Sequence, residues 1–135
     1  MSDLHLDHIA IASKNLEQTV KIYEDIGFVF DESREVVADQ KVKTAFASVD
    51  TNAHIEILEP TDESSPIAKF ISARGEGIHH LCFRTENIEA KQAELSEKGY
   101  RFIYPEPVVG AGGCMVNFIH PKSADGVLIE LSQKQ

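Results

Sequence analysis

Apolar and polar residues change their spacing along the chain in an order that occurs twice. The stretch "LDHIAIA", residues 6–12, alternates and ends in small residues, which predicts a β-strand. Apolar residues then recur at helical spacing from Leu16 to Tyr23, after the favourable N-cap residue Asn15 and before Gly27, a common helix stop. Three further strands are predicted in "FVFDES", "VKTAFASV" and "HIEILEP". The first part of the chain is therefore predicted to form a strand, a helix and three strands.

The second part repeats this order with "GIHHLCFRT", a helix from Asn87 to Gly99, and then "YRFIY", "CMVNFIH" and "GVLIELS". Aligning "HIAIASKNLEQTVKIYEDIGFVF" with "HLCFRTENIEAKQAELSEKGYRFI" pairs His8 with His80 and Gly27 with Gly99, each 72 positions apart. Such self-similarity indicates two copies of one module. Between the copies, "TDESSPIAKFISARGEG" is predicted to be a loop with one short helix.

The length of 135 residues is that of one domain with a sizeable core. No stretch between the two copies has the composition of a linker between independent domains. We therefore predict a single domain, residues 1–135, in which the first module covers about residues 4–60 and the second about residues 77–133.

Composition and charge narrow the possible partners. The chain is 42% hydrophobic and 26% charged, as is usual for soluble proteins, and it has no apolar run long enough for a membrane span. Its N-terminal "MSDLHLDH" lacks the features of a signal peptide, so a cytoplasmic location is expected. A net charge of −9 argues against nucleic acid, and an anionic substrate would need a local cation or a metal. Cys82 and Cys114 have no metal or redox spacing and are expected to be reduced thiols.

Strand alternation distinguishes between the adjacent histidines of "GIHHLCF". Side chains along a strand point alternately to two faces, so in residues 6–12 the bulky Ile9 and Ile11 share one face, and His8 shares the other with two alanines. The bulky face is predicted to pack on the helix, and the small-residue face is predicted to leave room for a ligand. In the second copy, His80 lies on the face that matches His8. His79 lies on the helix-packing face and is predicted to be structural.

The last strand of each copy contains a glutamate between branched aliphatic residues, Glu56 in the first and Glu130 in the second. Burying a carboxylate is costly unless it is paired or bound to a metal. Two such glutamates occur at equivalent places, and each copy also offers a histidine. The predicted ligands of one divalent metal ion (Co, Mn, Ni or Zn) are therefore His8, Glu56, His80 and Glu130.

This arrangement resembles the vicinal oxygen chelate superfamily of glyoxalases, ring-cleaving dioxygenases and fosfomycin-resistance enzymes. Within it the chain is most similar to the methylmalonyl-CoA epimerase family, over nearly its whole length. The stretches that carry the similarity are "DHIAIA", "DESSPIAKFI", "GIHHLCFRT" and "NFIHPKSADGVLIEL", with the glycine-rich "VGAGG" before the last. The resemblance implies an α+β fold in which two tandem βαβββ modules pair into a curved mixed sheet that encloses a metal site. It also implies a homodimer and an acyl-CoA substrate.

The implied reaction inverts the α-carbon of methylmalonyl-CoA by 1,1-proton transfer through a metal-stabilised enolate. The family's metal ligands correspond to the four residues already selected. Inversion needs a base on one face of the substrate and a proton donor on the other. The prototype bacterial epimerases have glutamine where this chain has Glu56, and a catalytic glutamate where it has Thr44. The predicted catalytic residues are Glu130 and Glu56, and the predicted substrate-binding residues are Lys122 and Thr44.

Two other functions are compatible with this resemblance. The chain is alternatively a glyoxalase-type isomerase of a glutathione adduct, or a non-catalytic member of the superfamily that binds a small molecule. The drug-sequestering members lack the metal ligands, so the presence of all four predicted ligands in this chain argues against a non-catalytic binding function. A dioxygenase is less favoured, because iron oxygenases usually use two histidines and one carboxylate.

Overall fold

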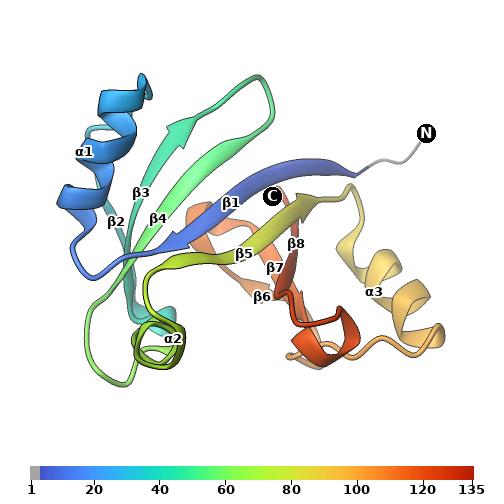
Figure 1. Ribbon diagram of the computed structural model, residues 1–135. Coiled ribbons are helices and arrows are strands. Elements are labelled where there is room, and N and C mark those ends of the chain that lie inside the picture. Colours follow the sequence, from blue (N-terminus) through green and yellow to red (C-terminus); the bar gives the residue numbers. More distant parts are fainter. Residues whose placement is uncertain (1–3) are drawn as a thin grey trace. The chain divides into compact units, whose positions relative to one another are not determined.

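The computed structural model describes residues 4–135, so residues 1–3 of the predicted domain lie outside the described residues. Within them the order of elements follows the predicted repeat (Figure 1). The first module consists of β1 (His5–Ala12), α1 (Leu16–Ile26), β2 (Glu35–Val37), β3 (Val42–Ser48) and β4 (His54–Pro60). The second consists of β5 (Gly77–Arg84), α3 (Ile88–Glu97), β6 (Val108–Val109), β7 (Met115–Ile119) and β8 (Ile129–Gln133), and α2 (Pro66–Arg74) lies between the modules in the sequence. The predicted α+β fold with two βαβββ modules is confirmed.

The chain divides into two compact units. One is His8–His79, and the other combines residues 4–7 with His80–Gln135. The strand order is β2-β3-β4-β1 in the first module and β5-β8-β7-β6 in the second. Within each module the first and last strands are parallel neighbours, and the remaining neighbours are antiparallel. Each module thus has a mixed sheet in which the two strands that carry the candidate ligands lie side by side.

The two module helices, α1 and α3, each begin after an asparagine N-cap, and Asn15 was predicted in this role. The Asn15 side chain accepts a hydrogen bond from the backbone N–H of Gln18 at 3.2 Å, and Asn87 accepts one from Ala90 at 3.0 Å. Helix α1 ends at Gly27, whose φ of 129° lies in the region that favours glycine. Within residues 4–135, no helix is both long and apolar enough to cross a membrane.

The two faces of β1 are covered by different helices. Ile11 packs against the cluster that contains Leu16 and Val20 of α1, as predicted for the bulky face. The small-residue face does not remain open along its length, because Ala10 and Ala12 belong to a buried cluster with Ile67 and Ile71 of α2. The expected space for a ligand is therefore absent beside Ala10 and Ala12.

The first of the three strands predicted after each helix is wrong in both modules. Instead of "FVFDES" and "YRFIY", the strands are β2 and β6, which lie further along the chain. Phe30 and Phe102 each make a single isolated bridge, to Ala47 and Ile119, and the chain then leaves the sheet. Polar residues follow Phe30, and after Phe102 prolines that lack an N–H cannot extend the ladder.

Candidate functional site

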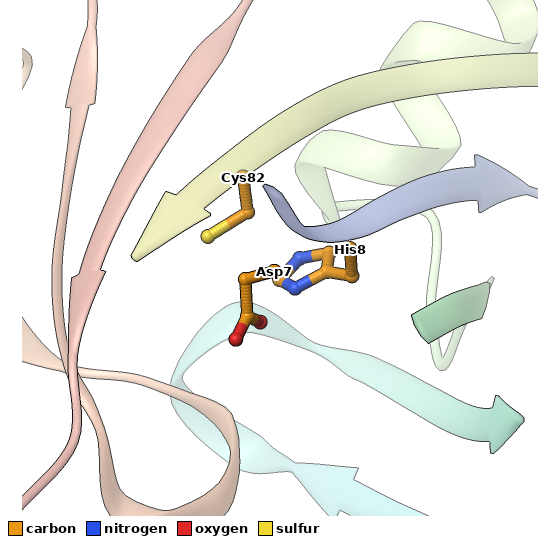
Figure 2. A group of neighbouring side chains, drawn as sticks. All are labelled: Asp7, His8 and Cys82. Carbon is orange, nitrogen blue, oxygen red and sulfur yellow. The ribbon is translucent and has the colours of Figure 1, made fainter. Parts of the chain in front are cut away.

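His8 on β1 and Glu56 on β4 form a buried imidazole–carboxylate pair in the first module. Nε2 of His8 lies 3.3 Å from Oε1 of Glu56, and the two residues are 7% and 4% exposed. Figure 2 shows the His8 ring projecting from β1. The pair forms because β1 and β4 run in parallel, with His8 opposite His54 and Ala10 opposite Glu56. The small Ala10 leaves the carboxylate room to lean along the sheet toward the histidine.

His80 on β5 and Glu130 on β8 form the equivalent pair in the second module. Nε2 of His80 lies 2.9 Å from Oε1 of Glu130, and the residues are 6% and 7% exposed. The residue opposite Glu130 on the parallel strand is Cys82, another small side chain, which projects from β5 (Figure 2). The two modules therefore build the same pair with the same local geometry.

A phenylalanine flanks each pair on its other side, and the sequence interpretation missed both. Phe46 on β3 is opposite Glu56, and Phe118 on β7 is opposite Glu130. The signal was available, because these two phenylalanines are also 72 positions apart. A single apolar residue in a strand is usual, however, and only the pairing register shows which residue it adjoins.

His79 lies apart from these pairs, as its predicted structural role requires. Its ring is half-buried and packs edge-on against Phe70 of α2, with ring centroids 4.8 Å apart. The alternation of β5 thus places His79 with a packing partner and His80 with a carboxylate.

The donor atoms of each pair fit a divalent ion. Histidine nitrogen and carboxylate oxygen bind zinc at about 2.0–2.2 Å, so two such ligands at neighbouring positions around one ion lie about 3.0–3.4 Å apart. The separations of 3.3 Å for His8–Glu56 and 2.9 Å for His80–Glu130 are close to this spacing. Each pair thus has its prospective ligand atoms turned toward each other. Mixed nitrogen and oxygen donors suit Co, Mn, Ni or Zn.

The two predicted substrate-binding residues differ in their surroundings. Thr44 on β3 is buried, and its hydroxyl donates a hydrogen bond to the backbone carbonyl of Glu35 at 3.3 Å. Lys122 is exposed in the short 3₁₀ turn Pro121–Ser123, and its backbone N–H donates to Nδ1 of His120 at 3.1 Å. His120 therefore caps the turn that precedes β8, and the Lys122 ammonium extends from a fixed backbone.

Neither Cys82 nor Cys114 forms a disulfide within residues 4–135. Cys82 is buried, and the half-buried Cys114 lies just before β7. Burial, followed by the negative charge of Asp7, raises the pKa of the Cys114 thiol. Asp7 itself accepts a hydrogen bond at 3.0 Å from Nε of Arg84, which offsets part of its charge. The raised pKa means that the Cys114 thiol is protonated and unreactive at neutral pH.

Comparison with known proteins identifies the family. The family model of the glyoxalase/bleomycin resistance protein/dioxygenase superfamily matches residues 7–118. The chain belongs to this superfamily. It is 38% identical over 131 residues to the mitochondrial methylmalonyl-CoA epimerase of Dictyostelium discoideum. This alignment covers 96% of this chain and 78% of that protein. It is also 38% identical over 135 residues to an ethylmalonyl-CoA/methylmalonyl-CoA epimerase of Cereibacter sphaeroides, in an alignment that covers 95% of this chain and 96% of that protein.

Solved structures give the same result. Methylmalonyl-CoA epimerase from Mycobacterium tuberculosis matches with a TM-score of 0.93 and 37% identity over 100% of this chain and 91% of that one. A variant of the Streptomyces coelicolor methylmalonyl-CoA epimerase, in complex with 2-nitronate-propionyl-CoA, matches with a TM-score of 0.88 and 37% identity over 96% of both chains. The predicted family is confirmed, and the chain is an enzyme of the methylmalonyl-CoA epimerase type.

Proposed function

We propose that this enzyme is metal-dependent and inverts the α-carbon of methylmalonyl-CoA by 1,1-proton transfer. The observation that carries the proposal is the buried His–Glu pair repeated at equivalent positions in the two modules. The epimerase relatives support the reaction, and the Streptomyces coelicolor complex supports an acyl-CoA substrate.

The proposed ligands of one divalent ion are His8, Glu56, His80 and Glu130, which join the two pairs in one site. When bound, the ion supplies Lewis-acid stabilisation of the negative charge that develops on the thioester oxygen as the α-proton leaves. The chain's own contribution is to keep both imidazoles and both carboxylates buried and mutually oriented before substrate arrives.

Glu56 and Glu130 are proposed to move the proton, one on each face of the α-carbon. In each, Oε1 faces an imidazole, so the second carboxylate oxygen is the atom assigned to proton transfer. In one direction, the carboxylate on the first face accepts the α-proton and leaves its electron pair delocalised into the thioester. The protonated acid on the second face then returns a proton to the α-carbon, which completes the inversion.

Thr44 does not replace the missing family glutamate as a base, because its hydroxyl has no acidity near neutral pH and is engaged with the carbonyl of Glu35. We propose it as a substrate contact only. The exposed Lys122 is proposed to meet an anionic group of the acyl-CoA. A homodimer remains a prediction from family resemblance.

The deciding experiment incubates the metal-loaded protein with one epimer of methylmalonyl-CoA in deuterated water. We expect deuterium at the α-carbon and an equilibrium mixture of both epimers, with both signals lost after chelation and restored by added metal. A metal-loaded protein that exchanges no α-proton, but converts the glutathione hemithioacetal of methylglyoxal, is a glyoxalase-type isomerase instead.

A further inference from the structure

We infer that Phe46 and Phe118 are positioning residues that fix the orientation of His8 and His80, respectively, in the proposed metal site. The inference rests on the proposed metal dependence and concerns residues that would not bind the ion themselves. Each phenylalanine lies on the strand that is antiparallel to the glutamate-bearing strand, directly opposite that glutamate. The same arrangement in both modules is the first argument for a shared role.

The second argument is the ring geometry. The rings of His8 and Phe46 are perpendicular at 90°, with centroids 6.4 Å apart. The rings of His80 and Phe118 are also perpendicular at 90°, with centroids 5.7 Å apart. Both separations lie within the range of about 4.5–7 Å in which aromatic rings attract each other edge-to-face. A perpendicular neighbour restricts rotation of the imidazole about its bond to the Cβ atom, which is the rotation that would turn Nε2 away from its carboxylate.

The third argument is the position of each glutamate between its two neighbours. Glu56 has Ala10 on one side and Phe46 on the other, and Glu130 has Cys82 and Phe118. The small residue leaves space toward the histidine, and the phenylalanine fills the opposite side. The carboxylate is thereby directed toward Nε2, at 3.3 Å in the first module and 2.9 Å in the second. Without the phenyl ring, both imidazole and carboxylate would gain rotational freedom that metal binding must remove again.

A His–Phe contact outside both His–Glu pairs provides a matched control. His79 and Phe70 are also nearly perpendicular, at 83°, with centroids 4.8 Å apart. Neither residue belongs to the two His–Glu pairs. Phe70→Leu therefore removes an aromatic contact to a histidine without altering a proposed ligand, whereas Phe46→Leu and Phe118→Leu remove contacts to proposed ligands.

The experiment measures the affinity of each purified variant for Zn²⁺ and Co²⁺ by competition with a chelator, and records the absorption spectrum of bound Co²⁺. An aromatic pair contributes about 0.5–1.5 kcal/mol, so each of Phe46→Leu and Phe118→Leu should weaken metal binding about two- to tenfold. The double variant should show the product of both effects and an altered Co²⁺ spectrum. Phe46→Tyr and Phe118→Tyr keep the ring and, at these half-buried positions, should retain wild-type affinity. If a leucine variant does not fold, the methionine variant, which is closer to phenylalanine in volume, replaces it.

Three results would overturn the inference. A double variant that binds metal within about twofold of the wild type shows that the rings have no positioning effect, since the two pairs together predict a loss of at least about fourfold. A Phe70→Leu variant that loses as much affinity as the site variants shows that the effect is general destabilisation. A wild-type protein that binds no divalent ion removes this inference and the proposed metal dependence together, which distinguishes that failure from the first two.

Discussion

Replacing His80 and His79 by alanine, one at a time, separates the proposed ligand from its sequence neighbour. His80 is buried beside Glu130, whereas His79 is half-buried beside Phe70. We expect His80→Ala to abolish specific uptake of a divalent metal, and His79→Ala to bind metal like the wild type while lowering the stability of the fold.

The expected magnitudes follow from these contacts. His79→Ala removes one aromatic pair, which corresponds to about 0.5–1.5 kcal/mol of unfolding free energy. His80→Ala removes the imidazole that lies 2.9 Å from the buried Glu130 carboxylate, and a buried polar group deprived of its partner costs about 1–3 kcal/mol. Because loss of a residue that merely supports a ligand weakens metal binding about 10–100-fold, loss of the ligand itself should exceed about 100-fold.

Metal linkage turns this difference into a stability measurement. At a free metal concentration of about 1,000 times the wild-type Kd, binding stabilises the fold by about 4 kcal/mol, and a hundredfold weaker site leaves about 1.4 kcal/mol. Urea denaturation of each variant with and without metal measures this gain. We expect the full gain for His79→Ala and a much smaller one for His80→Ala. The reverse result, with metal stabilisation kept in His80→Ala and lost in His79→Ala, would refute the alternation argument.

Three further predictions concern the carboxylates and one tight turn. Glu56→Gln keeps a ligand oxygen but removes a base, so it should hold metal and exchange the α-proton of one epimer with deuterium without interconverting the epimers; wild-type interconversion contradicts the assignment. A hydrogen bond from Arg34 lowers the pKa of Glu17 below its usual 4.5, so this pair stabilises the fold above about that pH and its contribution disappears as pH falls through the lowered pKa. Because the Glu17 side chain is 62% exposed, Arg34→Met should cost at most about 1 kcal/mol at pH 7. In urea unfolding followed over pH, the gap between wild type and variant should close in acid, and a gap independent of pH contradicts this. Gly110→Ala would place a Cβ 2.9 Å from Val116 Cγ2, so we expect the free energy of unfolding to fall by about 1–3 kcal/mol, measured as a lower melting temperature. An unchanged melting temperature shows that the turn accommodates the added methyl group.

Much of the fold was predictable because local rules and the repeat agree. Asn15 caps α1 as predicted, and its repeat equivalent Asn87 caps α3, since a cap depends on one side chain and the next few backbone N–H groups. The alternation of β1 and β5 correctly separated the buried His80 from His79, because every second side chain of a strand shares a face. The buried state of Glu56 and Glu130 was likewise indicated by their aliphatic neighbours.

The features of the fold and the site that were not predicted depend on contacts between segments distant in sequence. Phe30 and Phe102 have the apolar neighbours of a strand, but each makes only one bridge before the chain leaves the sheet. The packing of α2 against Ala10 was equally hidden, since no periodicity in β1 reveals which helix covers its small residues. The roles of Phe46 and Phe118 required the pairing register.

The two modules are similar but not identical, and this has a thermodynamic consequence for an epimerase. His54 lies opposite His8 on the neighbouring strand and edge-on to Phe46, whereas at the corresponding place, two residues before Glu130, the second module has Leu128. In the proposed mechanism, in which each module acts on one face of the substrate, the two faces therefore meet different side chains. A catalyst cannot move an equilibrium, so the ratio of kcat/KM for the forward and reverse directions stays fixed by the two epimers alone. Divergence between the modules is free to alter kcat and KM separately in each direction, provided that these changes cancel in that ratio.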